Sequence, residues 1–439
     1  MKHKSNLQGR AVYVVDGSRT PFLKAKGVGP FSGSDLAVAT GQILLNRQPF
    51  APTDLDEVII GSAMPGPDEV NIARVVALRL GCGHQVPAFT VMRNCASGMQ
   101  ALDNAAIQIA SGRSNLVLAG GTDAMSHAPL LFSEKMADWL AKWFAAKSFK
   151  QKAGLITQFK LSYLAPVIAL IRGLTDPIVG LNMGQTAEKL AFRFNISREQ
   201  MDAFANQSHH RLAHAYEESK MTEVTPIFDS KGRLYSQDNG YRADSSIEKL
   251  STLKPFFDKK YGMVTAGNSS QITDGACLLL LASEEAIKKW NLPVMGKIVD
   301  SQWAALDPSE MGLGPVHAAT PIMKRHGLVA KDFDCWEINE AFAAQVLACL
   351  AAWDDKEYCK NHLGLKEAFG APSLDCLNKD GGAIAVGHPI GASGARIVLH
   401  VLEDLIQNKG KRGMAAICIG GGQGGAMYLE RVTEVSGNE

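Results

Sequence analysis

Short runs of apolar residues recur along the chain, and glycines cluster where these runs end. Runs of this length, bounded by turn residues, are typical of strands that are buried on both faces of a sheet. The pattern therefore predicts strands at residues 11–15, 58–60, 116–119, 277–281, 336–338 and 415–419.

Longer segments between these runs place apolar residues at helical spacing. They predict helices at residues 34–45, 71–80, 96–111, 186–193, 198–218, 341–353 and 394–407. Regular alternation of strands and helices favours an α/β fold with largely parallel sheets.

Three segments of the first half recur, in the same order, in the second half. The similar pairs are 54–61 with 332–339, 96–99 with 392–395, and 115–121 with 414–421. Their order suggests two similar halves packed about a pseudo-twofold axis, and chance similarity between glycine-ended strands is the alternative. The stretch from about 130 to 261 lacks strong strand signals, so we expect it to be inserted between the halves or draped over them.

Composition narrows the class of protein. With 439 residues the chain is long enough for about three structural units. Its 45 Lys and Arg nearly balance its 44 Asp and Glu, which argues against a protein that binds nucleic-acid phosphates. The eight cysteines form no Cys-x-x-Cys pair, so neither a metal site nor a disulfide framework is predicted. The polar start and the lack of long apolar runs favour a cytoplasmic enzyme without a signal peptide.

Cys95 is the first candidate for chemistry, because it lies at a predicted strand-to-helix turn. The positive end of the following helix would lower the pKa of the thiol and make the thiolate available. The alternative is a buried structural cysteine. His388 lies among glycines just ahead of another predicted helix, which favours a base over a merely solvated loop residue.

Two further residues end predicted strands. Cys418 is followed by the glycine-rich run 420–425, which formally contains Gly-x-Gly-x-x-Gly. A dinucleotide site would need a helix next, but residues 426–430 have the pattern of a strand, so we reject that interpretation. Asn339 either caps the helix that follows or holds a water or carbonyl oxygen in an active site.

The motifs around these residues make the chain resemble the thiolases, which are acetyl-CoA acyltransferases. The matching motifs are Cys95-Ala-Ser-Gly, Asn339-Glu-Ala-Phe, Gly387-His-Pro, Cys418-x-Gly-Gly-Gly, Met183-Gly-x-Thr-Ala-Glu and residues 264–276. They follow the family's order from Arg19-Thr-Pro-Phe to the C-terminus, so the resemblance covers nearly the whole chain.

The resemblance implies a thiolase fold, with two duplicated α/β halves in a five-layer αβαβα arrangement and an inserted loop domain. It implies that Cys95 accepts the acyl group, that His388 activates Cys95 as a base, and that Cys418 moves a proton to or from the second thiol. Asn339, through a water, would form one oxyanion site with His388. The backbone N–H groups of Cys95 and Gly420 would form the other.

The same resemblance locates the substrate. Ser270 matches the family serine that touches the pantetheine arm of coenzyme A (CoA), and we expect Asn182, Met183, Met311 and Phe342 at the substrate site as well. CoA is a co-substrate, and neither a permanently bound cofactor nor a metal is implied. The family also implies a homodimer or a homotetramer.

We expect four segments along the chain. The N-terminal half takes residues 1–128, the loop domain 129–261, the return to the N-terminal half 262–285, and the C-terminal half 286–439. Short-chain members carry His where Asn182 stands here, so a preference for acetoacetyl-CoA is not expected. Residues 131–176 resemble the extra segment of thiolases that work with a multifunctional β-oxidation partner, although those members often have His in place of Asn339.

The leading hypothesis is therefore CoA-dependent thiolysis of medium or long 3-ketoacyl-CoA in fatty acid β-oxidation. The alternatives are an acetyl-CoA C-acetyltransferase that condenses two acetyl-CoA molecules, a ketoacyl-ACP synthase and, remotely, a non-catalytic lipid carrier. Presence of Cys95, His388 and Cys418 argues against the last two, because a synthase lacks the second cysteine and a carrier would have lost one of the three.

The insertion itself has the pattern of a basic amphipathic segment. One helical face collects Met136, Trp139, Leu140, Trp143 and Phe144. Lysines 135, 142, 147, 150, 152 and 160 accompany this face, opposed by Glu134 and Asp138. Such a segment binds an anionic membrane surface or a partner protein, or else it packs on its own loop domain or roofs an acyl tunnel.

Overall fold

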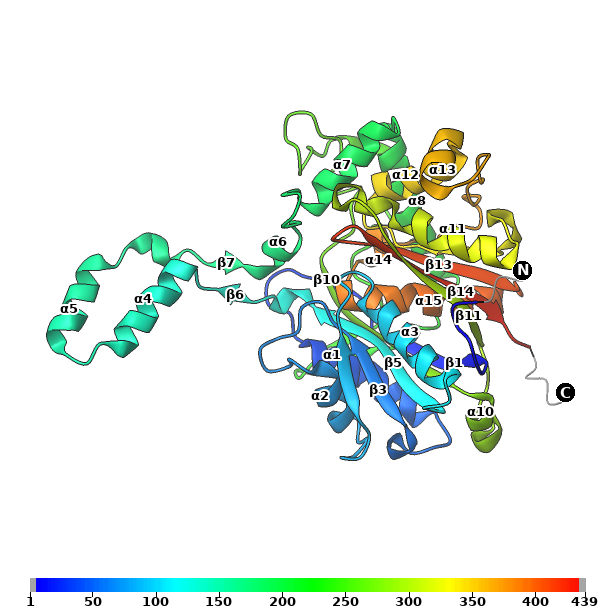
Figure 1. The fold of residues 1–439 in the computed structure, drawn as a ribbon, viewed down its shortest axis with the longest axis horizontal. Helices are drawn as coiled ribbons and strands as arrows, with labels where there is room; N and C mark the ends of the chain where they lie inside the picture. Colours follow the sequence, from blue (N-terminus) through cyan, green and yellow to red (C-terminus); the bar gives the residue numbers. More distant parts are fainter. Residues whose placement is uncertain (1–4, 434–439) are drawn as a thin grey trace.

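The computed structural model describes residues 5–433, and its main sheet runs without interruption through both halves of the chain (Figure 1). The strand order is β12-β13-β14-β11-β1-β10-β5-β3-β4, and β2 (Leu23–Lys24) pairs with β10. The two halves meet where β1 pairs with β11, at Val12–Ile298, Tyr13–Lys297 and Val14–Gly296.

Each half of the sheet has the same plan. The strands of the N-terminal half are β1 (Val12–Arg19), β3 (Glu57–Gly61), β4 (Ala88–Val91), β5 (Leu116–Ala124) and β10 (Thr273–Ala282). There, β3 is parallel to β4 and β5, while β10 is antiparallel to both β5 and β1.

The C-terminal half repeats this arrangement. Its strands are β11 (Gly296–Ala305), β12 (Cys335–Ile338), β13 (Arg412–Ile419) and β14 (Gln423–Arg431). Here β12 is parallel to β13, and β14 is antiparallel to β13 and β11. The predicted duplication is confirmed, but the prediction of largely parallel sheets is wrong. Most pairs in the sheet are antiparallel, because β10 and β14 run against both of their neighbours.

Helices separate and cover the two halves of the sheet in five layers. The central helices are α3 (Ser97–Ala110) and α15 (Ile390–Gln407), which contact each other and strands of both halves. The outer helices are α1 (Gly33–Asn46), α2 (Ile72–Arg79), α10 (Glu284–Trp290), α11 (Gly314–His326), α12 (Ala343–Asp354) and α13 (Lys356–Leu363). Three apolar clusters fill the spaces between these layers, so the predicted αβαβα order is confirmed.

A covering region of helices lies over the C-terminal half, at the top of Figure 1. Its helices include α7 (Met183–Arg193), α8 (Arg198–Glu217), α9 (Ile247–Ser251) and α14 (Ala383–Val386). The short strands β8 (Ile227–Phe228) and β9 (Leu234–Tyr235), between α8 and α9 in sequence, pack against the N-terminal half instead. A buried ion pair ties this region to β1, because the Arg19 guanidinium donates to both carboxylate oxygens of Asp238, at 2.7 and 2.8 Å.

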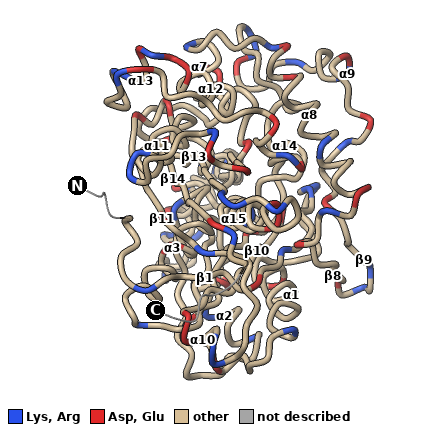
Figure 2. The backbone as a smooth tube through the Cα atoms, turned by 90° about the vertical axis from the view of Figure 1, so that its right-hand side faces the viewer, with Lys and Arg blue, Asp and Glu red and all other residues tan. Residues whose placement is uncertain are grey.

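Short 3-10 helices complete the chain. They are η1 (Pro52–Asp54), η2 (Met125–His127), η3 (Leu161–Leu164), η4 (Pro308–Leu313) and η5 (Ala330–Asp332). On the face opposite the arm described next, acidic and basic residues are interspersed along the chain (Figure 2).

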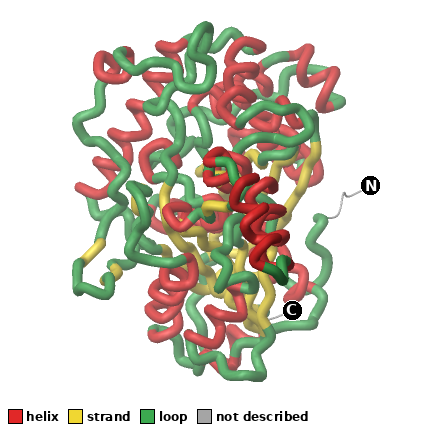
Figure 3. Tube along the Cα trace, turned by 90° about the vertical axis from the view of Figure 1, so that its left-hand side faces the viewer, coloured by secondary structure: helices red, strands yellow, loops and turns green. Residues whose placement is uncertain are grey.

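Residues 130–168, which we call the arm, project away from the rest of the molecule (Figure 1). The arm contains β6 (Leu130–Leu131), α4 (Glu134–Ala145), α5 (Phe149–Gln158), η3 and β7 (Val167–Ile168), and α6 (Ala169–Gly173) follows it. Strands β6 and β7 pair at its base, and the helices stand in front of the body when the arm points at the viewer (Figure 3).

The predicted apolar face of α4 packs mainly inside the arm. The Trp139 ring stacks on Trp143 and meets Phe159 edge to face, and its Nε1 donates to the Leu155 carbonyl at 3.0 Å. Phe144 is the exception, with 81% of its surface exposed.

Candidate functional site

The turn that carries Cys95 is held by its own neighbours. Strand β4 ends at Val91 and α3 begins at Ser97, so the chain must reverse its local direction within a few residues. Asn94 adopts the left-handed conformation, with φ of 43°. The Ser97 hydroxyl accepts from the Arg93 N–H at 2.9 Å and donates to the Asn94 carbonyl at 2.7 Å. These bonds fix the backbone on both sides of Cys95.

Burial decides the ionisation of Cys95. Desolvation raises the pKa of this thiol, although hydrogen bonds from the backbone N–H groups of Gly420 and of Cys95 itself lower it, and Asp123 adds to the rise. The expectation that the start of α3 lowers this pKa overall is therefore wrong, because the loss of water outweighs the favourable dipoles. The resting group is a thiol, which needs a base to become a nucleophile.

Two residues of the C-terminal half, Cys418 and Gly420, lie near the Cys95 sulfur. Cys418 is buried near the end of β13, and desolvation, followed by the nearby Cys95, raises its pKa well above the usual value. Asn94 Nδ2 donates to the Gly420 carbonyl at 2.8 Å across the two halves. A methyl group on Gly420 would lie 3.2 Å from the Met183 sulfur, so Met183 is also close.

His388 lies between α14 and α15. Its backbone N–H donates to the Gln271 carbonyl at 3.1 Å, and its Nδ1 pairs with the Ser393 hydroxyl at 2.6 Å. Ser393 in turn donates to the Pro389 carbonyl, so the start of α15 fixes the orientation of the His388 ring. The other ring nitrogen, Nε2, is buried and has no protein partner within the described residues. Burial, aided by the Arg396 cation, lowers the pKa of His388 to about 4, so the imidazole is neutral at physiological pH.

Asn339 follows β12 and is completely buried. Both polar atoms of its side chain lack a hydrogen-bond partner among the described residues. The following helix, α12, begins at Ala343, and its N-cap residue is Phe342, which provides no side-chain cap, so the interpretation of Asn339 as a helix cap is wrong. A buried amide without a partner is costly, which points to a water or a substrate oxygen as its intended partner.

The neighbouring Glu340 links this loop to the histidine loop. Its carboxylate is buried and accepts from the Ile384 N–H in α14 at 3.2 Å and from Asn378 Nδ2 at 2.8 Å. The loop carrying Asn339 and the loop carrying His388 are thereby held by one side chain.

The remaining predicted substrate-site residues lie in three places. The Ser270 N–H donates to the Ala341 carbonyl at 2.9 Å, next to Phe342, whose ring meets Phe257 edge to face. Met311 is buried in the apolar cluster that also contains Cys418 and Phe342. Asn182 uses its amide oxygen to cap α7, accepting from the Gln185 N–H at 2.9 Å.

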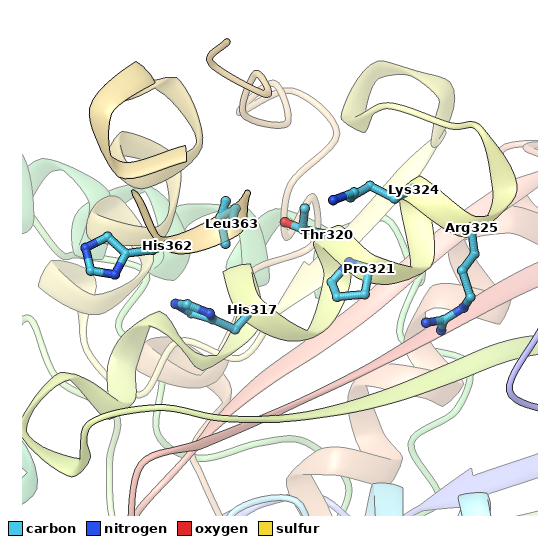
Figure 4. A pocket seen from close by; sticks show the side chains of 7 residues that line it. All are labelled: His317, Thr320, Pro321, Lys324, Arg325, His362 and Leu363. Carbon is cyan, nitrogen blue, oxygen red and sulfur yellow. The ribbon is translucent and has the colours of Figure 1, made fainter. Parts of the chain in front are cut away.

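Two cavities stand out on the surface, and neither contains Cys95. The larger, about 380 Å³, lies over α11 and the end of α13 (Figure 4). Its lining comprises His317, Thr320, Pro321, Lys324, Arg325, His362 and Leu363, none of them a predicted site residue. The second, about 320 Å³, borders the residues 62–69 and Asp123.

Sequence reasoning missed several residues that organise the site. Asn94, Ser393 and Gln271 support the cysteine, the histidine ring and the histidine backbone respectively. Asn94 stands next to Cys95 and Ser393 stands five residues after His388, so inspection of the neighbours of the predicted site residues could have found both. Gln271 lies in the matched segment 264–276, next to Ser270, but far from His388 in sequence, so only the fold shows that it holds the histidine backbone.

Comparison with known proteins agrees with this geometry. The thiolase N-terminal domain matches residues 12–285 and the thiolase C-terminal domain matches residues 292–431. The bovine mitochondrial trifunctional enzyme subunit beta is 37% identical, over 96% of this chain and 88% of that protein.

Solved structures are similar over their full length. Human mitochondrial 3-ketoacyl-CoA thiolase in complex with CoA has a TM-score of 0.83 at 35% identity, covering 98% of this chain and 100% of that one. The Bacillus anthracis acetyl-CoA acetyltransferase has a TM-score of 0.83 at 33% identity, covering 97% and 100%. The chain belongs to the thiolase family, and it is an acyltransferase.

The low pKa of His388 makes a prediction about pH. If the neutral imidazole is the base for Cys95, it stays competent until the pH approaches about 4. The acid limb of kcat/KM, which reports the base of the free enzyme, should therefore lie well below 6. Between pH 7 and 5.5 we expect less than a twofold loss of kcat/KM. A histidine with an ordinary pKa near 6.5 would lose about tenfold over the same range, and that result would contradict the assignment.

Proposed function

We propose that the protein cleaves 3-ketoacyl-CoA with a second CoA, giving acetyl-CoA and an acyl-CoA shortened by two carbons. The observation that supports this most is the meeting of two thiols, Cys95 and Cys418, with the N–H groups of Cys95 and Gly420 directed at one sulfur. One thiol can hold an acyl group while the other handles protons, which is what a two-step transfer requires.

In the first step His388 takes the proton of Cys95, and the sulfur attacks the 3-keto carbon. We assign the N–H groups of Cys95 and Gly420, which hydrogen-bond the Cys95 sulfur, to stabilise the oxyanion of this addition. The bond between C2 and C3 then breaks, the acyl group stays on sulfur, and the electron pair passes to the enolate of acetyl-CoA. Cys418 protonates the enolate carbon, and acetyl-CoA leaves.

The enolate needs its own donors, and the unpartnered polar atoms supply them. The side-chain polar atoms of Asn339 and His388 Nε2 are buried and have no hydrogen-bond partner in residues 5–433, so we assign them to the thioester oxygen, with Asn339 acting through a water. In the second step a new CoA loses its thiol proton to the Cys418 thiolate and attacks the acyl group on Cys95. The Cys95 sulfur leaves and takes back its proton from His388, and the shortened acyl-CoA is released. We place the pantetheine arm beside Ser270, with Met183, Met311 and Phe342 around the reacting groups.

The reverse condensation of two acetyl-CoA molecules uses the same residues, and the similarity to an acetyl-CoA acetyltransferase favours it as the second candidate. Asn182 favours thiolysis of longer substrates, because short-chain members carry His at this position, whereas the amide here caps α7. Measuring kcat/KM for thiolysis of C4 to C16 3-ketoacyl-CoA decides between them. Degradative function predicts a maximum above C4, and a maximum at C4 with negligible longer-chain activity would contradict it.

The separate roles of the two cysteines are testable by substitution. In Cys418→Ala, His388 still activates Cys95, so acylation of Cys95 by 3-ketoacyl-CoA should persist. Turnover should fall by about 100-fold or more, because a proton donor and acceptor is missing from both steps. Rapid-quench mass spectrometry measures the acyl-enzyme beside steady-state turnover. If the acylation burst is lost to the same extent as turnover, Cys418 is not the separate proton donor and acceptor proposed here.

The arm adds a second element to the proposal, and we assign its tip to an anionic membrane surface. Phe144 and Phe149 flank the turn between α4 and α5, and they are 81% and 89% exposed. Lys147 and Lys150 are exposed beside them. Aromatic rings that insert among headgroups, surrounded by cations, are characteristic of membrane-surface binding. No helix in residues 5–433 is long and apolar enough to cross a bilayer.

The tip can be changed without disturbing the packing inside the arm. Phe144→Glu with Phe149→Glu should reduce co-sedimentation with vesicles of phosphatidylcholine and phosphatidylglycerol by about tenfold. Binding of the unmodified protein should weaken as salt is added, because ions screen the lysines. Phe192→Glu, at an equally exposed phenylalanine on α7, is the matched control and should bind like the unmodified protein.

Two results would contradict the membrane assignment. One is failure of the unmodified protein to bind anionic vesicles at low salt. The other is binding to a β-oxidation partner, rather than to vesicles, that depends on Phe144 and Phe149. The bovine relative is named as a subunit of a trifunctional enzyme, which makes a protein partner the natural competitor.

A further inference from the structure

Asp123 is a buried carboxylate at the boundary between the two halves of the molecule. It lies near the end of β5, with 1% of its surface exposed, and it borders the 320 Å³ cavity. On one side it faces residues 62–64 of the N-terminal half, and on the other it faces the start of α15 from the C-terminal half.

The two oxygens of the Asp123 carboxylate accept hydrogen bonds from both sides of this boundary. Oδ1 accepts from the Ser62 hydroxyl at 2.7 Å and from the Met64 N–H at 3.1 Å. The Ala63 N–H lies 3.2 Å from both oxygens. Oδ2 accepts from the Gly391 N–H at 2.6 Å. An uncharged amide of the same shape has only one acceptor oxygen, so it cannot serve both sides.

The bond to Gly391 supplies what α15 lacks. Helix α15 begins after Pro389, which has no side chain able to cap the free N–H groups of the first turn. Those groups carry partial positive charge, and a carboxylate at this end of a helix is favourable. Asp123 acts as that cap from another part of the chain, across the boundary between the halves.

The approach at Gly391 is too close for any side chain. A methyl group there would lie 2.7 Å from the Thr122 carbonyl oxygen and 2.9 Å from Asp123 Oδ2. The helix start is therefore pressed directly onto β5. His388 stands only three residues earlier, and its ring is oriented by Ser393 in the first turn of the same helix. Whatever fixes the start of α15 also fixes the base.

We propose that Asp123 is a positioning residue for the acyl transfer, which holds the start of α15, and with it His388, in place for Cys95. The inference rests on the proposed function and deepens it. Asp123 does not serve to activate the cysteine electrostatically, because its charge raises the pKa of the Cys95 thiol. The position of this carboxylate near Cys95 is instead explained by its hydrogen bonds, which join residues 62–64 to the start of α15.

The test compares two buried carboxylates on adjacent strands. Asp123→Asn removes the acceptor from one side of the boundary. Asp274→Asn is the matched control, because Asp274 is 2% exposed on β10 and accepts from the N–H and hydroxyl of Ser126, with no bond to α15 in the described structure. The thermal midpoint, the KM for CoA and the rate of Cys95 acylation by 3-ketoacyl-CoA are measured for both.

We expect both substitutions to lower the thermal midpoint. Asp123→Asn alone should slow Cys95 acylation by about 10- to 100-fold, since small misplacements of a reacting group have effects of this size, with KM changed less than threefold. Equal acylation rates in Asp123→Asn and the unmodified enzyme would overturn the proposal, as would an equal loss in Asp274→Asn.

If Asp123→Asn does not fold, Asp123→Glu answers the same question. It keeps the charge and displaces the oxygens by about one bond length, so acylation should slow at least threefold at unchanged KM, and an unchanged rate would overturn the proposal. Failure of the proposed function is recognised separately, because the unmodified enzyme would then show no acyl group on Cys95 at all.

Discussion

The close crossing of helices α3 and α15 is the constraint on which the rest of the molecule depends. A methyl group on Gly98 would lie 2.7 Å from the Gly391 carbonyl oxygen, and one on Gly394 would lie 2.7 Å from the Met99 nitrogen. The two helices therefore meet through their backbones, in the central layer between the two halves of the sheet. Cys95 stands two residues before α3 and His388 two residues before α15, so this crossing constrains the relative positions of the two residues that we propose as nucleophile and base.

Desolvation also governs the ionisation of the candidate site residues. Burial raises the pKa of both cysteines and lowers that of His388, so all three groups rest in their neutral forms. Neutral groups are much less costly to bury than charged ones. In the proposed reaction charge appears only during acyl transfer, and we assign the N–H groups of Cys95 and Gly420 to stabilise it. Such a site holds no permanent thiolate, and preorganised hydrogen-bond donors would stabilise the negative charge that forms during the reaction.

The sequence predicted what is local and missed what depends on pairing across the chain. Short apolar runs marked most strands of the main sheet, and the repeat marked the two halves, because burial and turn residues leave a signal within a few positions. Strands β4 and β11 were missed. The direction of β10 and β14 left no such signal, since an apolar strand has the same pattern in parallel and antiparallel pairs. The net effect of burial on Cys95 was also hidden, because the residues that cover it come from both halves.

Contacts across the boundary between the halves were invisible for the same reason. Asn94 with Gly420 and Asp123 with Gly391 each join residues more than 260 positions apart. The family motifs located Cys95, His388, Cys418 and Asn339, and their assigned roles stay predictions until they are measured.

The most direct test is to locate the acyl group and ask whether it depends on the other half of the chain. The enzyme is mixed with 3-ketoacyl-CoA in the absence of free CoA, quenched in acid, digested and analysed by peptide mass spectrometry. The account predicts an acyl mass on the peptide containing Cys95 and its loss, at the same quench time, in folded His388→Ala. An acyl group on a different residue, or undiminished acylation of Cys95 in His388→Ala, would contradict it.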